Sequence, residues 1–427
     1  MSSQSTPILN QKPVVTKAAP QSESDKTTEV SRLVVDFYKD VLPYYLPCAT
    51  FFVQHLVYFM MNGNLLWVML FAYVVNFPYY QHTRKKPRKE TNLDRESENV
   101  WKKDWRFMGP LYAYVAADAL TWLWCMCVVS GMYPPFLPAW LFEDKITKTV
   151  GGFVTFTFVW GYMAGVNGLA GHELIHRKGT WDKGIGMFTF SKIFYSHFLL
   201  EHGSGHHRNV ATPEDSATAR KGETFLFFAF RSAVGGHVNT WNREVSRLQI
   251  KCKSEHVPMV TLLTQNRMTW FFALHVAMAF SILGVFGTRA LLFQVVYALV
   301  GIFFIELINY TEHYGLLRQK DARGIYEPIN EQHSWNASSS HLLFRIQRHS
   351  DHHMHAYRPY QILRKFDEAP MMPYMYLYSL LLALCPPLWF STMDQLLINE
   401  QPKHENANRL FFLCFIVSLA YSTYCFI

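Results

Sequence analysis

The sequence predicts an all-α integral membrane protein of about six transmembrane helices, with a helical cap on one side of the bilayer. Its 427 residues are 50% hydrophobic and 16% aromatic but only 17% charged, whereas soluble domains carry about 25% charged residues. The apolar residues gather in runs close to the ~20 residues that a membrane-crossing helix needs. The aromatic content excludes a disordered chain, and the lack of a sustained heptad excludes a coiled coil.

Six apolar runs are the predicted spans. They are Tyr45–Met61, Leu65–Tyr80, Phe107–Met132, Val150–Ala170, Trp270–Phe286 and Ala290–Ile308. The first two are separated by Asn-Gly-Asn at positions 62–64, which predicts a tight helical hairpin. Nearer the C-terminus, Met375–Phe390 is interrupted by two prolines, and an interfacial helix fits it as well as a span. The last run, Leu410–Ile427, fits a seventh crossing as well as a re-entrant anchor.

The chain divides at two changes of composition. Residues 1–32 are rich in Ser, Thr, Gln and Lys, which predicts a disordered polar tail rather than a signal peptide. Residues 33–395 form the predicted membrane domain, and residues 396–427 form a C-terminal extension that carries the last apolar run. None of the seven cysteines forms a CxxC pair, so a zinc ribbon, a fused rubredoxin and a thioredoxin-like motif are unsupported.

The charge of the loops predicts which side of the membrane each one occupies. Nine Lys and Arg residues lie between Gln81 and Arg106, and cytosolic loops carry such an excess. The loop Tyr133–Thr149 has two Lys residues offset by two acidic ones, so we assign it to the external side. Counting spans then places residues 171–267, and those from Tyr310 onward, in the cytosol.

The expected localisation is a multi-pass protein of a bacterial inner membrane or the endoplasmic reticulum. Because the basic residues lie beside apolar runs, the net charge of +8 indicates a lipid bilayer and not nucleic acid as the partner.

Histidine is concentrated on the predicted cytosolic side. Of 19 histidines, 16 lie between His172 and His355. Nine of these 16 form four clusters, Gly171–Arg177 (GHELIHR), Glu201–His207 (EHGSGHH), Asn309–Leu316 (NYTEHYGL) and Gln347–His353 (QRHSDHH). Residues four apart share one helix face, so His172 and His176 are predicted to reach one metal ion, and His202 and His206 are spaced in the same way. His207 faces another direction, so the second cluster can serve two metals.

The histidines exceed what one ion needs. HExxH at positions 172–176 is also the zinc-protease motif, in which the Glu is a general base, but such proteases require only one further ligand. Nine imidazoles exceed the four ligands of zinc and suit two transition-metal ions. Imidazole accepts zinc, copper, iron or nickel, so the spacing does not name the metal. A site at the membrane favours redox iron, because its substrates are apolar. The alternative is a set of solvated surface histidines.

The four clusters resemble the signature boxes of the membrane alkane 1-monooxygenases, a family of the histidine-box di-iron desaturase and hydroxylase superfamily. Residues 210–215 (VATPED), 331–336 (EQHSWN) and 366–370 (FDEAP) are also similar to that family, and the resemblance runs from about residue 100 to residue 395. The NYxEHYGL box separates this family from desaturases. Arg177 stands where the family usually has Lys, which keeps the charge.

The resemblance implies six transmembrane helices under a cytosolic cap that holds two iron ions. Its nine ligand positions correspond to His172, His176, His202, His206, His207, His313, His349, His352 and His353. It also implies insertion of one oxygen atom from O₂ into the terminal C–H bond of an alkane or alkyl chain, with electrons from rubredoxin. Because the chain has no CxxC pair, heme-attachment motif or dinucleotide fingerprint, we expect a separate, acidic, rubredoxin-like or similar electron-transfer protein.

Other residues near the boxes are weaker candidates. Four acidic residues that adjoin predicted ligands are candidates to orient imidazole N–H groups, with helix-surface acids as the alternative: Glu173, Glu201, Glu312 and Asp351. Seven further histidines have no matching role: His197, His237, His256, His275, His333, His341 and His355. Five aromatic residues of the spans either line an alkyl channel or face lipid: Trp67, Phe71, Tyr73, Trp122 and Trp124.

Two other functions fit parts of the pattern. A fatty-acyl desaturase or lipid hydroxylase of the same superfamily shares the histidine boxes. A histidine-based metal transporter would place its site near the bilayer midplane on broken helices, whereas these boxes lie at the predicted cytosolic edge.

Overall fold

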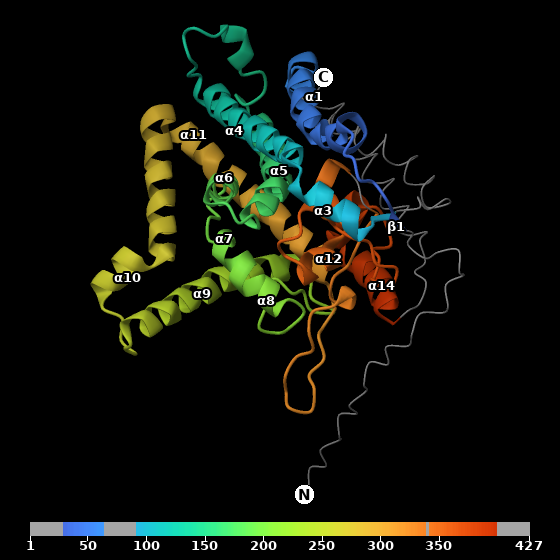
Figure 1. Ribbon diagram of the computed structural model, residues 1–427. Coiled ribbons are helices and arrows are strands. Elements are labelled where there is room, and N and C mark those ends of the chain that lie inside the picture. Colours follow the sequence, from blue (N-terminus) through green and yellow to red (C-terminus); the bar gives the residue numbers. More distant parts are fainter. Residues whose placement is uncertain (1–28, 64–90, 339–340, 399–427) are drawn as a thin grey trace, which may run out of the picture.

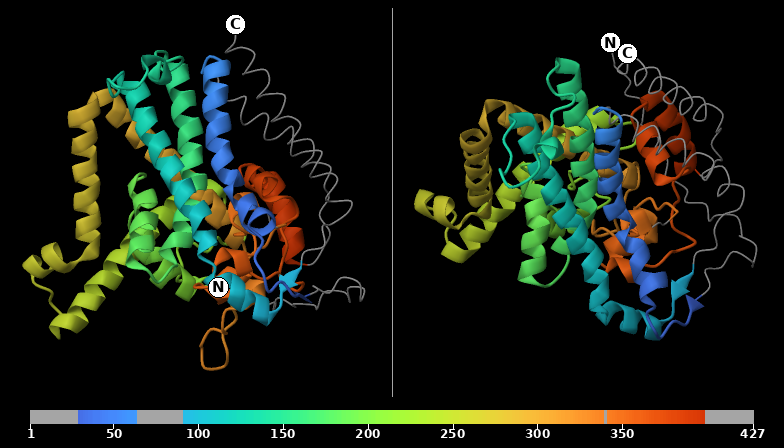
Figure 2. Two further views of the ribbon diagram at one scale, coloured as in Figure 1. Left: turned by 45° about the horizontal axis from the view of Figure 1, so that its top comes forward. Right: turned by 90° about the horizontal axis from the view of Figure 1, so that it is seen from above.

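The computed structural model describes residues 29–63, 91–338 and 341–398. Nearly all of the regular structure in these residues is helical (Figures 1 and 2). Two strands, β1 (Glu29–Val30) and β2 (Asn92–Leu93), form a parallel pair only two residues long. The predicted all-α class is confirmed.

Three helices of the described chain are long and apolar enough to cross a membrane: Trp105–Ser130, Val150–Ile175 and Arg267–His313. The first contains α4 (Met108–Ser130), which ends at Gly131 in the left-handed region with φ 73°. The second is α5 (Val150–Ile175), whose N-terminus is capped by Thr149, because its side chain accepts from the Gly152 N–H. These two helices coincide with the predicted spans 107–132 and 150–170.

The third long helix, α11 (Arg267–His313), is bent into two arms. Gly287 has φ 81° and ψ 179° inside the helix, a conformation that strongly favours glycine. Figure 1 shows the first arm at the edge of the molecule and the second arm passing through its middle. The arms match the two predicted spans 270–286 and 290–308, and Gly287 supplies the turn between them.

The first predicted span is helical but short. Helix α1 (Leu46–Met60) has 15 residues, about 22 Å at 1.5 Å per residue, against a hydrocarbon core of about 30 Å. Asn62 and Gly63 follow it with φ of 47° and 87°, as a tight turn requires. The predicted span Leu65–Tyr80, the apolar end Leu410–Ile427 and nearly all of the polar tail lie outside the described residues.

The segment Met375–Phe390 does not form one continuous helix. It contains α13 (Tyr376–Ala383) and the start of α14 (Pro386–Leu397). Neither helix is long enough to cross a bilayer, so the alternative of a span is wrong for this segment. Helix α13 is mostly buried against α11 instead, and Pro386 begins α14 at a position where its missing N–H costs nothing.

The remaining helices connect these elements (Figure 2). They are η2 (Phe37–Val41), η3 (Leu42–Tyr45), α3 (Arg95–Lys103), η4 (Trp105–Phe107), η5 (Ala139–Phe142), α6 (Thr180–Ser191), α7 (Phe198–Glu201), η6 (His202–His206), α8 (His207–Asn209), α9 (Phe225–Cys252), α10 (Met259–Gln265), η7 (Glu331–His333), η8 (His341–Leu343), α12 (His349–Met354) and η9 (Tyr360–Ile362).

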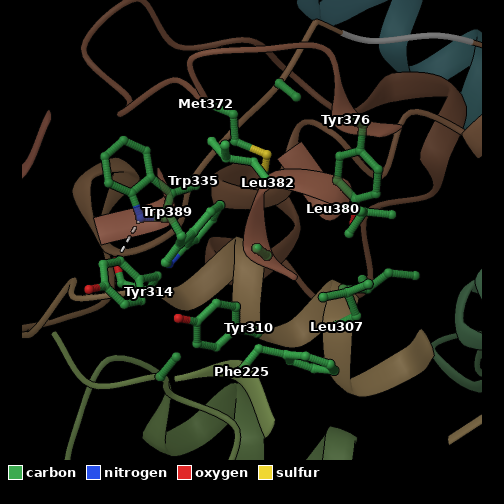
Figure 3. Packing of buried hydrophobic residues seen from close by; sticks show 14 of the residues in the cluster. Phe225, Leu307, Tyr310, Tyr314, Trp335, Met372, Tyr376, Leu380, Leu382 and Trp389 are labelled. Atoms are coloured by element: carbon green, nitrogen blue, oxygen red, sulfur yellow. Dashed lines mark hydrogen bonds between the residues drawn. The ribbon is translucent and has the colours of Figure 1, made fainter. Parts of the chain in front are cut away.

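Aromatic packing holds α14 against the end of α11. Tyr310 and Tyr314 lie with their ring centroids 5.3 and 5.4 Å from that of Trp389 (Figure 3). Trp335 adds a hydrogen bond from Nε1 to the Tyr314 carbonyl, 2.8 Å long. This cluster fixes the end of α11 that carries the third histidine box.

Glycines bring α5 and α11 close together. A Cβ added at Gly161 would lie 2.8 Å from the Cβ of Val300, and one at Gly165 would lie 2.6 Å from the Cβ of Phe304 and 2.8 Å from the Gly301 carbonyl oxygen. Small residues of this kind let two helix backbones approach closely in a membrane. The approach sets how far apart the first and third histidine boxes lie.

We therefore expect Gly165→Ala to destabilise the protein by about 1–3 kcal/mol, because the added methyl overlaps backbone that cannot move aside. Gly184→Ala on α6 is the matched control, since a Cβ there meets no atom within 4 Å. Thermal unfolding in detergent measures the difference. Equal melting temperatures for the two variants would contradict this account of the α5–α11 contact.

Candidate metal centre

The four histidine boxes converge from helix ends that are far apart in the sequence. His172 lies in the last turn of α5 and His176 follows it, while His313 is the last residue of α11. The second box occupies α7, η6 and α8, and the fourth occupies α12. All nine predicted ligands are at most 7% exposed. The alternative of solvated surface histidines is therefore wrong for these nine.

Five of the histidines form one group. The ligand nitrogens of His172, His176, His202, His207 and His352 all lie within 4.8 Å of one another. Nε2 of His202 is 2.7 Å from Nε2 of His172 and 3.0 Å from Nε2 of His207. Nitrogens bound to one metal at about 2.0–2.1 Å are separated by about 3 Å when they are neighbours. The group has the spacing of a metal coordination sphere.

The other four histidines form a second group beside it. His206, His313 and His353 meet the same criterion. Nε2 of His349 lies 3.2 Å from Nε2 of His313 and 3.0 Å from Nε2 of His353. Each of the nine histidines thus belongs to one of two adjoining groups.

A π-helical turn divides the second box between the two groups. Helix η6 (His202–His206) is a π-helix, and the His207 N–H donates to the His202 carbonyl. Hydrogen bonding from i to i+5 brings residues five apart onto one face. His202 therefore joins His207 in the first group, and His206 joins the second. The expectation that His202 and His206 share a face was wrong, because it assumed α-helical geometry.

The chemistry of the donors fits a metal. Burial and neighbouring imidazoles lower the pKa of His202, His207 and His352 well below the usual value, so these rings are neutral and able to bind a cation. Nε2 of His176, His206 and His352 has no hydrogen-bond partner. Buried nitrogens of this kind are unfavourable unless they are paired, and a bound metal would pair them.

Asp215 orients one ligand and was not predicted as a site residue. Its Oδ2 lies 2.9 Å from Nδ1 of His206, which turns the other ring nitrogen toward the group. Burial by itself would lower the pKa of His206, but the carboxylates of Asp215, Glu201 and Glu312 together outweigh it, and the pKa is raised. Thr218 holds Asp215 in turn through a 2.6 Å hydrogen bond. Asp215 belongs to the VATPED stretch, so the resemblance pointed to the segment without giving the residue a role.

Glu312 reaches the metal-facing side of a ligand. Its Oε2 lies 3.2 Å from Nε2 of His349, and its Oε1 accepts a 2.6 Å hydrogen bond from the Tyr376 hydroxyl. Glu312, His313 and His349 form a third cluster of converging ligand atoms. Glu312 is thus placed to contact a metal itself rather than to orient an imidazole from behind.

The other acidic candidates have different partners. Glu173 pairs with Arg177 at 2.7 Å and accepts from the Tyr360 N–H. Asp351 accepts from His355 at 2.9 Å and from the Arg364 N–H. Burial, followed by the Asp215 carboxylate, raises the pKa of Glu201 to about 7. The contacts of Glu173 and Asp351 position the backbone around the boxes, and neither contact joins an imidazole of the two groups.

None of the remaining candidates in the described residues belongs to the two groups. His197 stacks on His237 with ring centroids 3.5 Å apart, and His333 pairs with Glu327 at 3.3 Å. Trp122 donates to Gln294 and Trp124 donates to the Leu141 carbonyl. Neither tryptophan lines the three cavities described for the residues at or beside the centre, so these contacts do not support the channel-lining alternative for them. Residues 67, 71 and 73 lie outside the described chain.

Two cavities open onto the centre from different sides. A cavity of about 390 Å³, open part included, contacts His172, His202, His349 and Glu312, and the rest of its wall is mostly apolar. A wider cleft of about 1010 Å³, open part included, contacts His207 and His353 and is lined by polar residues such as Lys102, Tyr357 and Arg358. Each cavity therefore touches both histidine groups.

Comparison with known proteins agrees with this architecture. The family model described as fatty acid desaturase matches residues 149–386, more than half of the chain. The chain belongs to the fatty acid desaturase family. All four histidine boxes of this family member fall within the matched residues. Together with its apolar helices, this assigns it to the membrane proteins.

Its similar relatives are monooxygenases. It is 38% identical to alkane 1-monooxygenase 1 of Pseudomonas aeruginosa over 235 residues, which are 54% of this chain and 60% of that protein. It is 40% identical to alkane 1-monooxygenase of Acinetobacter baylyi over 239 residues, 55% of this chain and 57% of that one. The hydroxylase component of xylene/toluene monooxygenase from Pseudomonas putida is 29% identical over 52% of this chain and 57% of its own length. The chain thus spans less than two thirds of these relatives.

Asp215→Ala should weaken metal binding by the second group about 10- to 100-fold, because His206 loses the carboxylate that fixes its ring. Metal per chain, measured on purified protein by elemental analysis, should fall by about half. Glu327→Ala is the matched control, since it removes a similar carboxylate–histidine contact, to His333, outside both groups. The same metal content in both variants would contradict the role of Asp215.

Proposed function

We propose that this protein is a membrane non-heme di-iron monooxygenase that hydroxylates the terminal carbon of alkanes or alkyl chains with O₂ and electrons from a separate donor. The observation that carries the proposal is the pair of adjoining, buried, all-imidazole groups beside an apolar cavity. The similarity to alkane 1-monooxygenases supports the same reaction. Residues 33–395 would form the catalytic unit.

Each group would hold one iron ion. The first offers five neutral imidazoles, and the second offers four with the Glu312 carboxylate beside them. Bound iron would supply the activation of O₂ that protein side chains cannot provide. Because imidazoles carry no negative charge, Glu312 is the acidic group nearest to balance the charge of the second ion. Its hydrogen bond from Tyr376 fixes the carboxylate and leaves Oε2 directed at the group.

The cavity at the centre would hold the end of the substrate chain. Its wall includes Leu169, Phe190 and Ile305, which exclude water from the reacting carbon. Gly165 and Gly168 also line this cavity, so the alkyl chain of a substrate could approach close to the α5 backbone. The overall reaction, RH + O₂ + 2e⁻ + 2H⁺ → ROH + H₂O, requires a reductant and two protons from outside this cavity.

The polar cleft is where we expect electrons to enter. His207 belongs to the first group and His353 to the second. Their ring centroids lie 4.4 Å apart, and both residues line the cleft. Lys102 is exposed on its margin. A rubredoxin-like or other small acidic electron-transfer protein would be attracted to such a surface. Under this proposal the cleft and the four boxes would lie on the cytosolic side of a multi-pass protein.

The second candidate function is desaturation of an acyl chain, or hydroxylation of a lipid, by the same centre. The family model matched by this chain is named for that chemistry. A metal transporter is less compatible with the structure, because transporter sites lie near the bilayer midplane on broken helices. Here both groups are buried at helix ends, and the first group alone offers five ligands.

Purified protein loaded with iron should convert a medium-chain alkane to its primary alcohol only in the presence of O₂ and a reduced donor. With isotopically labelled O₂, mass spectrometry should find one labelled oxygen atom in the alcohol. Protein from which iron has been removed with a chelator is the control and should form no product. A desaturated acyl product without any alcohol would favour the second candidate instead.

Lys102→Glu should raise the KM for an acidic donor several-fold and leave the KM for the alkane unchanged, because it reverses a charge on the margin of the cleft. The control is Lys148→Glu in the loop between α4 and α5. Turnover by the unmodified protein should fall as ionic strength rises. Salt-independent turnover with rubredoxin, ferredoxin and cytochrome-b5-type donors would rule out docking by charge.

A further inference from the structure

A second, larger cavity extends away from the metal centre along the long helices. It lies between α1, α5 and α13 and measures about 1390 Å³, open part included. It follows α5 from Val159 to Leu169, which is about 15 Å at 1.5 Å per residue. Leu169 and Ile308 also line the small cavity at the centre, so the two cavities share a wall.

Most of the lining is apolar, and several of its polar groups already have partners. Three hydroxyls of the lining donate hydrogen bonds of 2.6 Å, from Tyr114 to Asn167, from Thr50 to the Pro47 carbonyl and from Tyr376 to Glu312. These groups need nothing from the contents of the cavity. They leave the rest of the surface suited to an alkyl chain.

Gln54 on α1 is different. Its side chain is 3% exposed and lines the cavity, and its Oε1 has no hydrogen-bond partner. A buried carbonyl oxygen without a donor is unfavourable, and buried polar groups nearly always have one. An amide oxygen can only accept, so the missing partner is an O–H or N–H group. An alkane carries neither.

The charge of the cavity narrows the choice of ligand. Among the described residues that line it, none is Lys, Arg or His. An ionised carboxylate would have no counter-charge in this apolar space, and it could not donate to Gln54. A neutral hydroxyl at the end of an alkyl chain meets both conditions.

We propose that this cavity binds a long-chain primary alcohol, whose hydroxyl donates to Oε1 of Gln54 while its methyl end passes Leu169 and Ile308 to the metal centre. The inference rests on the proposed hydroxylase function and names a substrate class for it. The reaction is HO–R–CH₃ + O₂ + 2e⁻ + 2H⁺ → HO–R–CH₂OH + H₂O. A terminal C–H bond breaks and a C–O bond forms. The electron-transfer protein supplies the electrons, the second oxygen atom leaves as water, and the product is an α,ω-diol.

The test compares dodecanol with dodecane on purified, iron-loaded protein. The measured quantity is kcat/KM for dodecanol divided by kcat/KM for dodecane, which removes differences in protein concentration between preparations. Gln54→Leu keeps a similar volume and removes the acceptor. We expect this ratio to fall about fivefold to tenfold in the variant, the effect of losing one neutral hydrogen bond. Iron content should not change, and wild-type protein should release the diol.

Gln395→Leu is the matched control. Its Oε1 also has no partner, but it lies on α14 and does not line the cavity. Gln54→Met repeats the measurement where the Leu variant loses iron. An unchanged ratio in the iron-bound Gln54 variants overturns the inference and leaves alkane hydroxylation standing. A wild-type protein that binds iron but converts neither substrate overturns the proposed function as well.

Discussion

The convergence of nine buried imidazoles is the interaction on which the rest of the structure depends. Their nitrogens approach to 2.7–3.2 Å, and several have no hydrogen-bond partner within the protein. Each unpaired buried nitrogen opposes folding by about 1–3 kcal/mol. The site is therefore unfavourable as bare protein and becomes favourable when it binds cations. Folding and metal binding should be coupled here, as in other metalloproteins.

The packing of the surrounding helices brings these imidazoles together. Close glycine contacts between α5 and α11 bring His172 and His313, which are 141 positions apart in the sequence, to one end of the helix pair. The π-turn at His202–His206 then distributes the second box over both groups. One extra residue in a helical turn thus decides that His207, and not His206, joins His202 in the first group.

The centre separates two environments. On one side it meets an apolar cavity that shares a wall with the larger cavity between α1, α5 and α13, and on the other it meets a polar cleft. An enzyme that oxidises an apolar chain with electrons from a soluble protein needs both surfaces. Under the proposed function, this separation would keep the electron donor and the substrate from competing for one approach. Glu312, between its hydrogen bond to Tyr376 and His349, lies at the apolar side.

The sequence by itself determined the fold class, three of the long helical segments, the two-armed shape of α11 and the set of nine histidines. Those properties depend on local hydrophobicity and on the spacing of one residue type, both of which can be read along the chain. The tertiary structure alone decided which histidines share a group, because the π-turn depends on packing that the spacing does not reveal. It also decided that Asp215 supports His206, that Glu173 pairs with Arg177, and that α13 is buried rather than spanning. The contact of Asp215, like the cavity that Gln54 lines, depends on how helix ends and connecting segments pack in three dimensions, which no local pattern specifies.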